Sequence, residues 1–264
     1  MSWEKEEKEK GLTRREWVKL GMVASAVGAV GAVGGLVTGQ ILPPPYKFSG
    51  EIRETIEYTK FPSPQWWNPK AGTPVKVSDF QEWQGATCVW RGLFQEGKYV
   101  PGTGFPCLII RIKREDQFFR VPADQDMPAP LPAGFSLFFD DEALDTAHGG
   151  TRIVALFDRC VHLCCKPGWH VVSSPAPGRD YGAYGASPPT FDQFGQDPVY
   201  CVCHGSQYDP MVLVVDRNDK NGARYVGALR VHGPAPRALP VIPLKAQGVN
   251  LVGGMANPAW YVYC

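Results

Sequence analysis

The sequence predicts an all-β head that follows one N-terminal membrane helix. Glycine and proline make up about a fifth of the 264 residues (29 Gly and 25 Pro), a proportion that favours a turn-rich, strand-based fold over a helical bundle. After the N-terminal region, short runs rich in Val, Ile and Phe are bounded by Gly, Pro or Asp, and no long apolar period of 3.6 residues occurs. One long uncharged stretch lies near the N-terminus, and its length suits a membrane-spanning helix.

The uncharged stretch covers residues 20–42 and consists mostly of Ala, Val, Gly and Leu. At about 1.5 Å per residue, a helix of this length just spans a hydrocarbon core of roughly 30 Å. Residues 13–19 read TRREWVK and resemble a twin-arginine export signal, which directs folded proteins across a membrane. Because basic residues before the stretch place the N-terminus inside, we expect a single-pass protein of the cell membrane with an extracytoplasmic head.

These features divide the chain into four expected parts: a cytoplasmic N-terminus at residues 1–19, a transmembrane anchor at 20–42, a proline-rich tether at 43–50 and the head at 51–264. A cleaved signal peptide is the alternative to an anchor. No good Ala-x-Ala site stands before the proline run, and the apolar stretch is longer than the hydrophobic region of a typical signal peptide. Both facts favour the uncleaved anchor.

Six short runs in the head are expected to be β-strands because they are rich in Val, Ile and Phe and end at turn-forming residues. They are residues 75–77, 107–112, 135–139, 153–157, 211–215 and 249–252. The length of the head is compatible with one all-β domain. Residues 166–200 form a long segment rich in Gly and Pro, and a loop of this length in a compact domain is generally functional or disordered.

Two boxes rich in cysteine and histidine flank this long segment. The first reads CVHLCC at residues 160–165, and the second reads CVCHGSQYD at residues 201–209. Together they hold five of the eight cysteines and two of the five histidines. Each box follows a strand-like run, so each is expected to be a tight loop at a strand end. A Cys and a His two or three residues apart on such a loop can point at one metal centre, and two facing loops supply four ligands.

The boxes are also compatible with a pair of disulfides, which suits an exported head, and with a structural zinc that has two Cys and two His ligands. Disulfides alone leave the paired placement of the histidines unexplained. Zinc accounts for four ligands, but not for the two further cysteines at matching offsets, nor for Ser206 and Tyr208. Outside the boxes, the sequence is equally compatible with a disulfide between Cys88 and Cys107 and with two separate thiols.

The pattern Cys-x-His-Leu-x-Cys followed by Cys-x-Cys-His-Gly-Ser-x-Tyr-Asp resembles the Rieske iron–sulfur protein of quinol-oxidising cytochrome bc complexes. Residues 233–236, GPAP, are similar to the proline loop that covers the cluster in that family, and residues 75–79 with 90–92 are similar to the start of its base domain. The long stretch between the boxes is more like archaeal or other deep prokaryotic members. The resemblance implies a Rieske-type antiparallel β-sandwich with a small cluster-binding subdomain at about residues 158–237.

The resemblance also implies one [2Fe–2S] cluster and assigns its ligands. Cys160 and Cys201 would hold the inner iron, and His162 and His204 would hold the outer, solvent-facing iron. A disulfide between Cys165 and Cys203 would tie the two loops together. Cys164 stands where the family usually has Gly.

Three further residues around the cluster are implied by the resemblance. Ser206 would donate a hydrogen bond to a bridging sulfide, Tyr208 would donate one to a ligand thiolate, and Pro234 would lie in the covering loop. Hydrogen-bond donors to cluster sulfur raise the reduction potential. We therefore expect a potential in the upper part of the Rieske range of about −150 to +300 mV.

As a function, the resemblance implies the membrane-anchored electron-transfer subunit of a quinol–cytochrome c reductase-type complex. It would take an electron and a proton from quinol beside a cytochrome b-type subunit, with His162 or His204 receiving the proton. It would pass the electron to a cytochrome c, haem or copper acceptor. The alternative is the Rieske subunit of a molybdenum oxidase such as arsenite oxidase. A formal net charge of +1 argues against a nucleic-acid partner.

Overall fold

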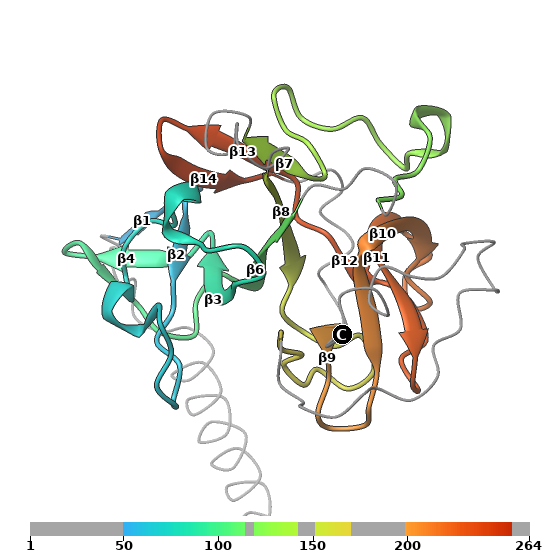
Figure 1. Ribbon diagram of the computed structural model, residues 1–264, viewed down its shortest axis with the longest axis horizontal. Helices are drawn as coiled ribbons and strands as arrows, with labels where there is room; N and C mark the ends of the chain where they lie inside the picture. The colour runs from blue at the N-terminus through green and yellow to red at the C-terminus, as the bar shows by residue number, and fades with distance from the viewer. Residues whose placement is uncertain (1–49, 114–118, 142–150, 170–198, 255–264) are drawn as a thin grey trace, which may run out of the picture. The chain divides into compact units, whose positions relative to one another are not determined.

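The computed structural model describes residues 50–113, 119–141, 151–169 and 199–254, and these form an all-β head (Figure 1). Within these ranges no helix is long and apolar enough to cross a membrane. The expected cytoplasmic segment, the anchor at residues 20–42 and the tether up to residue 49 lie outside the described residues. Among the described residues the helical segments are three short 3₁₀ turns, η1 (Asn68–Lys70), η2 (Val77–Asp79) and η4 (Asp124–Asp126).

The largest sheet has five antiparallel strands in the order β2-β3-β6-β8-β7. Its strands are β2 (Ile56–Tyr58), β3 (Gly85–Trp90), β6 (Phe105–Lys113), β7 (Phe139–Asp141) and β8 (Thr151–Phe157). Side chains of a strand alternate between the two faces of its sheet. On β6, Cys107 and Ile109 belong to one hydrophobic cluster, while Leu108 and Ile110 belong to another. Both faces of this strand are therefore buried, which explains its continuous apolar sequence.

A second sheet has four strands in the order β12-β11-β10-β9. Its strands are β9 (Val199–Tyr200), β10 (Gln207–Arg217), β11 (Arg224–His232) and β12 (Leu239–Pro240). One hydrophobic core joins this sheet to the five-stranded sheet, because Leu108 and Val154 share a cluster with Tyr208 and Leu213. The second box connects β9 to β10, so that core lies directly beneath it.

Two small antiparallel sheets complete the described head. The first has the order β1-β4-β5, and the second pairs β13 with β14. Their strands are β1 (Gly50–Ile52), β4 (Leu93–Gln95), β5 (Lys98–Tyr99), β13 (Leu244–Gln247) and β14 (Asn250–Gly253). An all-β fold is thus confirmed for the described residues.

Four of the six expected strands are confirmed, because residues 107–112, 153–157, 211–215 and 249–252 coincide largely with β6, β8, β10 and β14. The expectation for residues 75–77 was wrong. This run forms only a single bridge between Lys76 and Asn250 before the chain enters η2, where the Asp79 N–H donates to the Lys76 carbonyl (3.1 Å).

The expectation for residues 135–139 was also wrong over most of its length. A turn at Gly134, with φ at +79°, precedes the run, and Ser136 forms only an isolated bridge to Leu244. Pairing with β8 starts at Phe139. In contrast, β3 and β11 were not expected. β11 contains polar residues and a Gly, so its sequence does not have the composition of a strand. Its long pairing with β10 stabilises it.

Candidate metal centre

The first box forms a tight loop immediately after β8. The Cys160 N–H donates to the Cys165 carbonyl (2.7 Å), and the Cys164 N–H donates back to the Cys160 carbonyl (3.0 Å). These two bonds close the six residues of the box into a loop, so that the backbones of its first and last cysteines are in contact. The loop expected from the sequence at this strand end is confirmed.

The second box repeats this backbone arrangement after β9. The Cys201 N–H donates to the Ser206 carbonyl (2.8 Å), and the Gly205 N–H donates to the Cys201 carbonyl (2.9 Å). The fifth residue of each loop is left-handed, with φ at +63° for Cys164 and +79° for Gly205. This conformation suits Gly and is uncommon for other residues, which explains why a Gly is natural at the position that Cys164 occupies.

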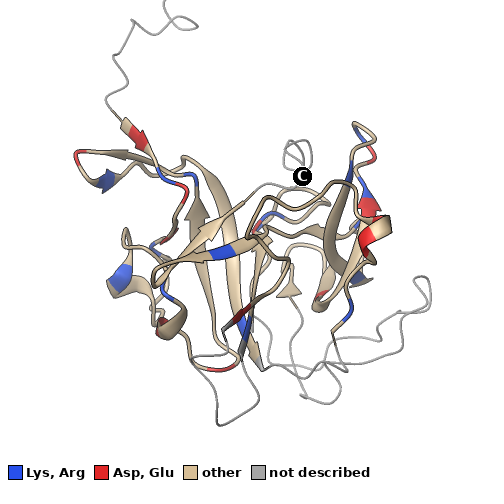
Figure 2. Ribbon diagram, turned by 90° about the horizontal axis from the view of Figure 1, so that it is seen from above, with Lys and Arg blue, Asp and Glu red and all other residues tan. Residues whose placement is uncertain are grey.

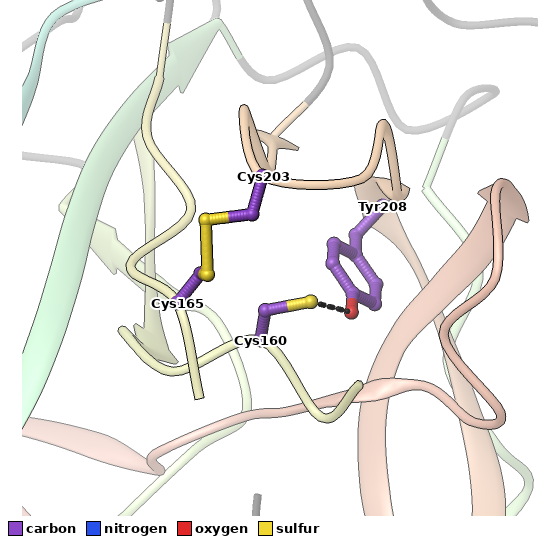
Figure 3. Close-up of a disulfide and its surroundings, with 4 residues drawn as sticks. All are labelled: Cys160, Cys165, Cys203 and Tyr208. Carbon is purple, nitrogen blue, oxygen red and sulfur yellow. Dashed lines mark hydrogen bonds between the residues drawn. A yellow bond between two sulfur atoms is a disulfide. The ribbon is translucent and has the colours of Figure 1, made fainter. Parts of the chain in front are cut away.

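A disulfide between Cys165 and Cys203 joins the two loops (Figure 3), with a Cα–Cα separation of 6.5 Å. This is the pairing that the sequence resemblance implied. The loops are also held at their bases, because Gly168 and Tyr200 exchange two backbone hydrogen bonds of 2.9 Å each. Cys164 is disulfide-bonded as well, so it is not a thiol available to a metal.

The four expected ligands form two close pairs on these loops, one of cysteines and one of histidines. Cys160 and Cys201 are free thiols, each only 1% exposed, and their side chains are in hydrogen-bonding contact. The rings of His162 and His204 lie with their centroids 4.8 Å apart, nearly perpendicular to each other. His204 is exposed and His162 is half-buried. Two sulfurs therefore lie inside, and two imidazoles lie toward the surface.

One buried nitrogen at this site is free to bind a metal. Nδ1 of His162 is buried and has no hydrogen-bond partner. Buried polar atoms in folded proteins almost always have a partner, and a neutral imidazole nitrogen with a lone pair is a good metal ligand. The donor set of two thiols and two imidazoles fits a tetrahedral metal or a two-iron cluster.

A different trio of cysteines is also close together. The sulfurs of Cys165, Cys201 and Cys203 all lie within 4.8 Å of one another. Two of the three are joined by the disulfide, and a disulfide sulfur is not a thiolate ligand. The three sulfurs are close together because the disulfide lies beside Cys201. Of the three residues, only Cys201 has a free thiol that could bind a metal.

Opposing effects act on the thiol of Cys201. Burial raises the pKa of Cys201, because a thiolate is costly to desolvate. The backbone N–H groups of Cys203 and His204 hydrogen bond to this sulfur and lower that pKa. These donors stabilise negative charge on the sulfur and offset part of the effect of burial, which still leaves the pKa of Cys201 raised.

Tyr208, the second residue of β10, contacts the other thiol. Its hydroxyl oxygen lies 3.1 Å from Sγ of Cys160 (Figure 3). Burial is the main cause that raises the pKa of Tyr208, so the phenol keeps its proton. The Val161 N–H donates to the same oxygen, and the hydroxyl keeps one hydrogen, which it donates to the Cys160 sulfur when that sulfur is a thiolate.

A third segment, the turn after β11, covers the second loop. The Ala235 N–H donates to Oγ of the fully buried Ser206 (3.1 Å), and a hydroxyl that accepts still has one O–H to donate. Gly233 approaches so closely that a Cβ there would lie 2.5 Å from the Ser206 Cα. Pro234 is exposed on this turn. The segment expected to cover the site is therefore in contact with it.

The structure also reveals features that sequence reasoning missed. Leu163 and Val202, one in each loop, are both 62% exposed, so each loop presents an apolar side chain to solvent within two residues of its histidine. No signal in the boxes indicated which apolar residues face solvent.

No protein-family model matches this chain, and no curated protein is significantly similar to it. The chemical interpretation therefore depends on the geometry. The described residues provide two buried thiols, two outward imidazoles and several hydrogen-bond donors to sulfur, all on two loops that a disulfide locks together. Such a site can hold a metal and can adjust the electronic properties of its sulfur ligands.

Proposed function

We propose that this chain is a Rieske-type electron-transfer protein that holds one [2Fe–2S] cluster between the two loops. Cys160 and Cys201 would bind the inner iron, and His162 and His204 would bind the outer iron. The observation that carries this proposal is the pairing of one buried free thiol with one outward imidazole on each loop. The all-β head is compatible with the β-sandwich that this proposal requires, and residues 158–237 would form its cluster-binding subdomain.

The hydrogen bonds around the sulfurs favour a redox centre over a structural zinc. The Tyr208 hydroxyl contacts the Cys160 sulfur (3.1 Å), and two backbone N–H groups bond to the Cys201 sulfur. Donors to ligand sulfur and to bridging sulfide tune the potential of an iron–sulfur cluster. Zinc has no redox chemistry for such donors to tune.

The chain's own residues divide the work of proton-coupled electron transfer. A bound cluster supplies a one-electron acceptor with a potential far above the about −400 mV of plant-type ferredoxins. Nδ1 of His162 is the buried atom available for ligation. The exposed His204 ring keeps a second nitrogen for a proton, and we assign to it the proton released by quinol.

The surface around the imidazoles suits a membrane-embedded partner. Leu163 and Val202 are exposed beside the two histidines, and an apolar rim of this kind fits a hydrophobic quinol and a cytochrome b-type subunit. In this proposal, residues 20–42 anchor the chain in the cell membrane with the head outside. The electron then passes to a cytochrome c, haem or copper acceptor.

Metal analysis and spectroscopy of the full-length chain test this function. Anaerobically purified protein should contain two irons and two sulfides per chain, and it should show an electron paramagnetic resonance signal after reduction. His204→Ala should lose that signal. Leu163→Ala, which changes an exposed residue of the same loops, should keep it. A colourless protein with one zinc would establish the structural alternative.

A further inference from the structure

The turn that covers the second loop, residues 233–238, is also held by another segment, the hairpin of β10 and β11. This hairpin supplies two carboxylates to the turn. The Ala238 N–H donates to Oδ2 of Asp216 (2.7 Å), and the Arg237 guanidinium forms an ion pair with Asp219. The covering turn is therefore bound both to the second loop and to a pair of aspartates that the proposed electron transfer does not use.

Arg237 is an unusual partner for an exposed carboxylate. Basic and acidic residues are interspersed along the described ribbon (Figure 2), and Arg237, at 2% exposure, is the only Lys or Arg whose described side chain is buried. An arginine is almost never fully buried without a charged partner, because its charge is costly to remove from water. The side chain of Asp219 is 57% exposed and supplies a negative charge to Arg237. This ion pair therefore helps to fix Arg237 and the turn that carries it.

The backbone around the two aspartates is cross-linked by hydrogen bonds. The Asn218 N–H donates to the Ala223 carbonyl (2.8 Å), and the Gly222 N–H donates back to the Asn218 carbonyl (2.7 Å). Asn218 is fully buried, and its Oδ1 accepts from the Lys220 N–H (2.9 Å). These bonds lie on both sides of Asp219 in the chain, so its carboxylate is presented from a fixed backbone.

The other end of this connection is the hydroxyl of Ser206. Ala235, two residues before Arg237, donates its N–H to Oγ of Ser206 (3.1 Å), and Ala235 and Ser206 are both buried. Pro234 and Pro236 flank Ala235, and their rings fix φ, so a displacement of Arg237 also moves Ala235. Since hydrogen bonds in a chain polarise one another, loss of the Ala235 bond weakens the hydrogen bond that the Ser206 O–H can donate.

We propose that Asp219 is a positioning residue for the Ser206 hydroxyl, acting through Arg237 and the covering turn. It would thereby raise the reduction potential of the cluster, although it belongs to neither loop. Asp216 acts in the same direction through its bond to Ala238. This inference rests on the proposed [2Fe–2S] function, because the potential of that cluster is the property that the Ser206 hydroxyl adjusts.

Redox titration of the full-length chain tests this role with Asp219→Asn, which removes the charge and keeps the size of the side chain. The weaker hold on the covering turn should shift the reduction equilibrium about threefold toward the oxidised state, which lowers the potential by roughly 30 mV. A purely electrostatic effect has the opposite sign, because loss of a negative charge favours the added electron. Asp219→Glu, which keeps the charge, should stay near the wild-type potential. Asp124→Asn, at an exposed carboxylate of η4, should not lower it.

A double variant shows whether the effect passes through Ser206. If Asp219 acts by positioning that hydroxyl, Asp219→Asn should lower the potential no further in a Ser206→Ala background. Asp216→Ala, which removes the acceptor of the Ala238 N–H, is a second variant and should lower the potential in the wild-type background only. Equal lowering in both backgrounds would contradict the proposal, as would an Asp219→Asn potential equal to or above that of wild type.

Hydrogen exchange measures the hold on the covering turn independently of bound iron. Mass spectrometry of a peptide of residues 233–240 follows few amides, because three of its eight residues are proline. These amides should exchange at least about tenfold faster in Asp219→Asn than in wild type or Asp124→Asn. Unchanged exchange would overturn the proposal. A chain without iron would contradict the proposed function, while the exchange rates would still decide whether Asp219 holds the turn.

Discussion

The hydroxyl oxygen of Tyr208 lies 3.1 Å from Sγ of Cys160, although 48 residues separate the two in the chain. The contact links the first residue of one loop to the strand that leaves the other. Because Tyr208 is fully buried, the bond is shielded from water. A hydrogen bond is stronger in such an environment of low dielectric constant than in water. The contact is therefore the most direct structural influence on the proposed cluster.

Tyr208→Phe should lower the reduction potential while the cluster remains bound. The lost bond stabilises charge on the sulfur more in the reduced state, and a difference of about 1 kcal/mol corresponds to roughly 40 mV for a one-electron couple. Redox titration measures the change. Tyr225→Phe is the matched control, since its buried hydroxyl donates to the Ala238 carbonyl (2.7 Å). Equal potentials in all three proteins would refute the assigned role.

Ser206→Ala should also lower the potential, because the serine hydroxyl has an O–H available near the cluster. It should reduce stability as well, since the Ala235 N–H loses its acceptor. A buried donor without a partner costs about 1–3 kcal/mol. Redox titration and denaturant unfolding of the same variant separate these two effects. An unchanged potential with reduced stability would limit Ser206 to a structural role.

Removal of the Cys165–Cys203 disulfide should destabilise the head. The bond closes a segment with a sequence separation of 38, for which loop entropy gives about 3–4 kcal/mol. The double variant Cys165→Ser/Cys203→Ser should show this loss in denaturant unfolding and should release iron faster. Val202→Ser, next to the bridge, is the control. An unfolding free energy equal to that of the control would mean that the hydrogen bonds alone hold the loops.

Gly233→Ala should disturb the covering turn. A Cβ there would lie 2.5 Å from the Ser206 Cα and 2.7 Å from the Ser206 N, so one of the two backbones must move. Gly134→Ala is a matched control, because Gly134 has a similar φ of +79° and no atom within 4 Å of the added Cβ. The left-handed conformation costs both variants about 1–2 kcal/mol. Only Gly233→Ala should lose more stability and expose the cluster to faster oxidative loss.

The buried carboxyl of Glu57 should make stability depend on pH. Burial raises its pKa above the usual 4.5, although Thr55 donates to Oε1 (2.8 Å). The folded state therefore binds more protons than the unfolded state in the window above about pH 4.5, and the unfolding free energy falls as pH rises through the raised pKa. Glu57→Gln should reduce this slope, to which the buried Asp158 also contributes because its pKa is raised to about 7, and it should be more stable than wild type at pH 7, by about 1.4 kcal/mol for each pKa unit.

Denaturant unfolding across that pH range measures the effect. Glu82→Gln, at an exposed carboxyl, should leave the pH profile unchanged. A wild-type profile that is flat or rises with pH over this window would contradict the expectation for Glu57.

Cys88 and Cys107 should remain thiols in the folded protein. They lie directly opposite each other on β3 and β6, and both are free and buried. Burial raises the pKa of Cys88, so little thiolate is available for reaction. An alkylating reagent should modify neither residue until the protein unfolds, as mass spectrometry can show. Val249→Cys, on an exposed turn, provides a reactive reference, and a pair that resists alkylation after unfolding would indicate a disulfide.

The sequence by itself determined the types of ligand and the local structure around them. The period and composition of residues 107–112 and 153–157 predicted β6 and β8, because an apolar run of this kind is stable only between two packed layers. The short spacing within each box predicted a tight loop after a strand. These properties depend on residues that are neighbours in the chain, which is why they can be read without a structure.

Only the tertiary structure decided which distant groups meet. It separated Cys165, which bridges to Cys203, from Cys164, and it kept Cys88 and Cys107 as opposed thiols. The contact of the covering turn with the second loop likewise follows from the pairing of β10 with β9 and β11. Strand pairing sets these distances, and its free energy comes from packing between segments far apart in the chain, which no local pattern encodes.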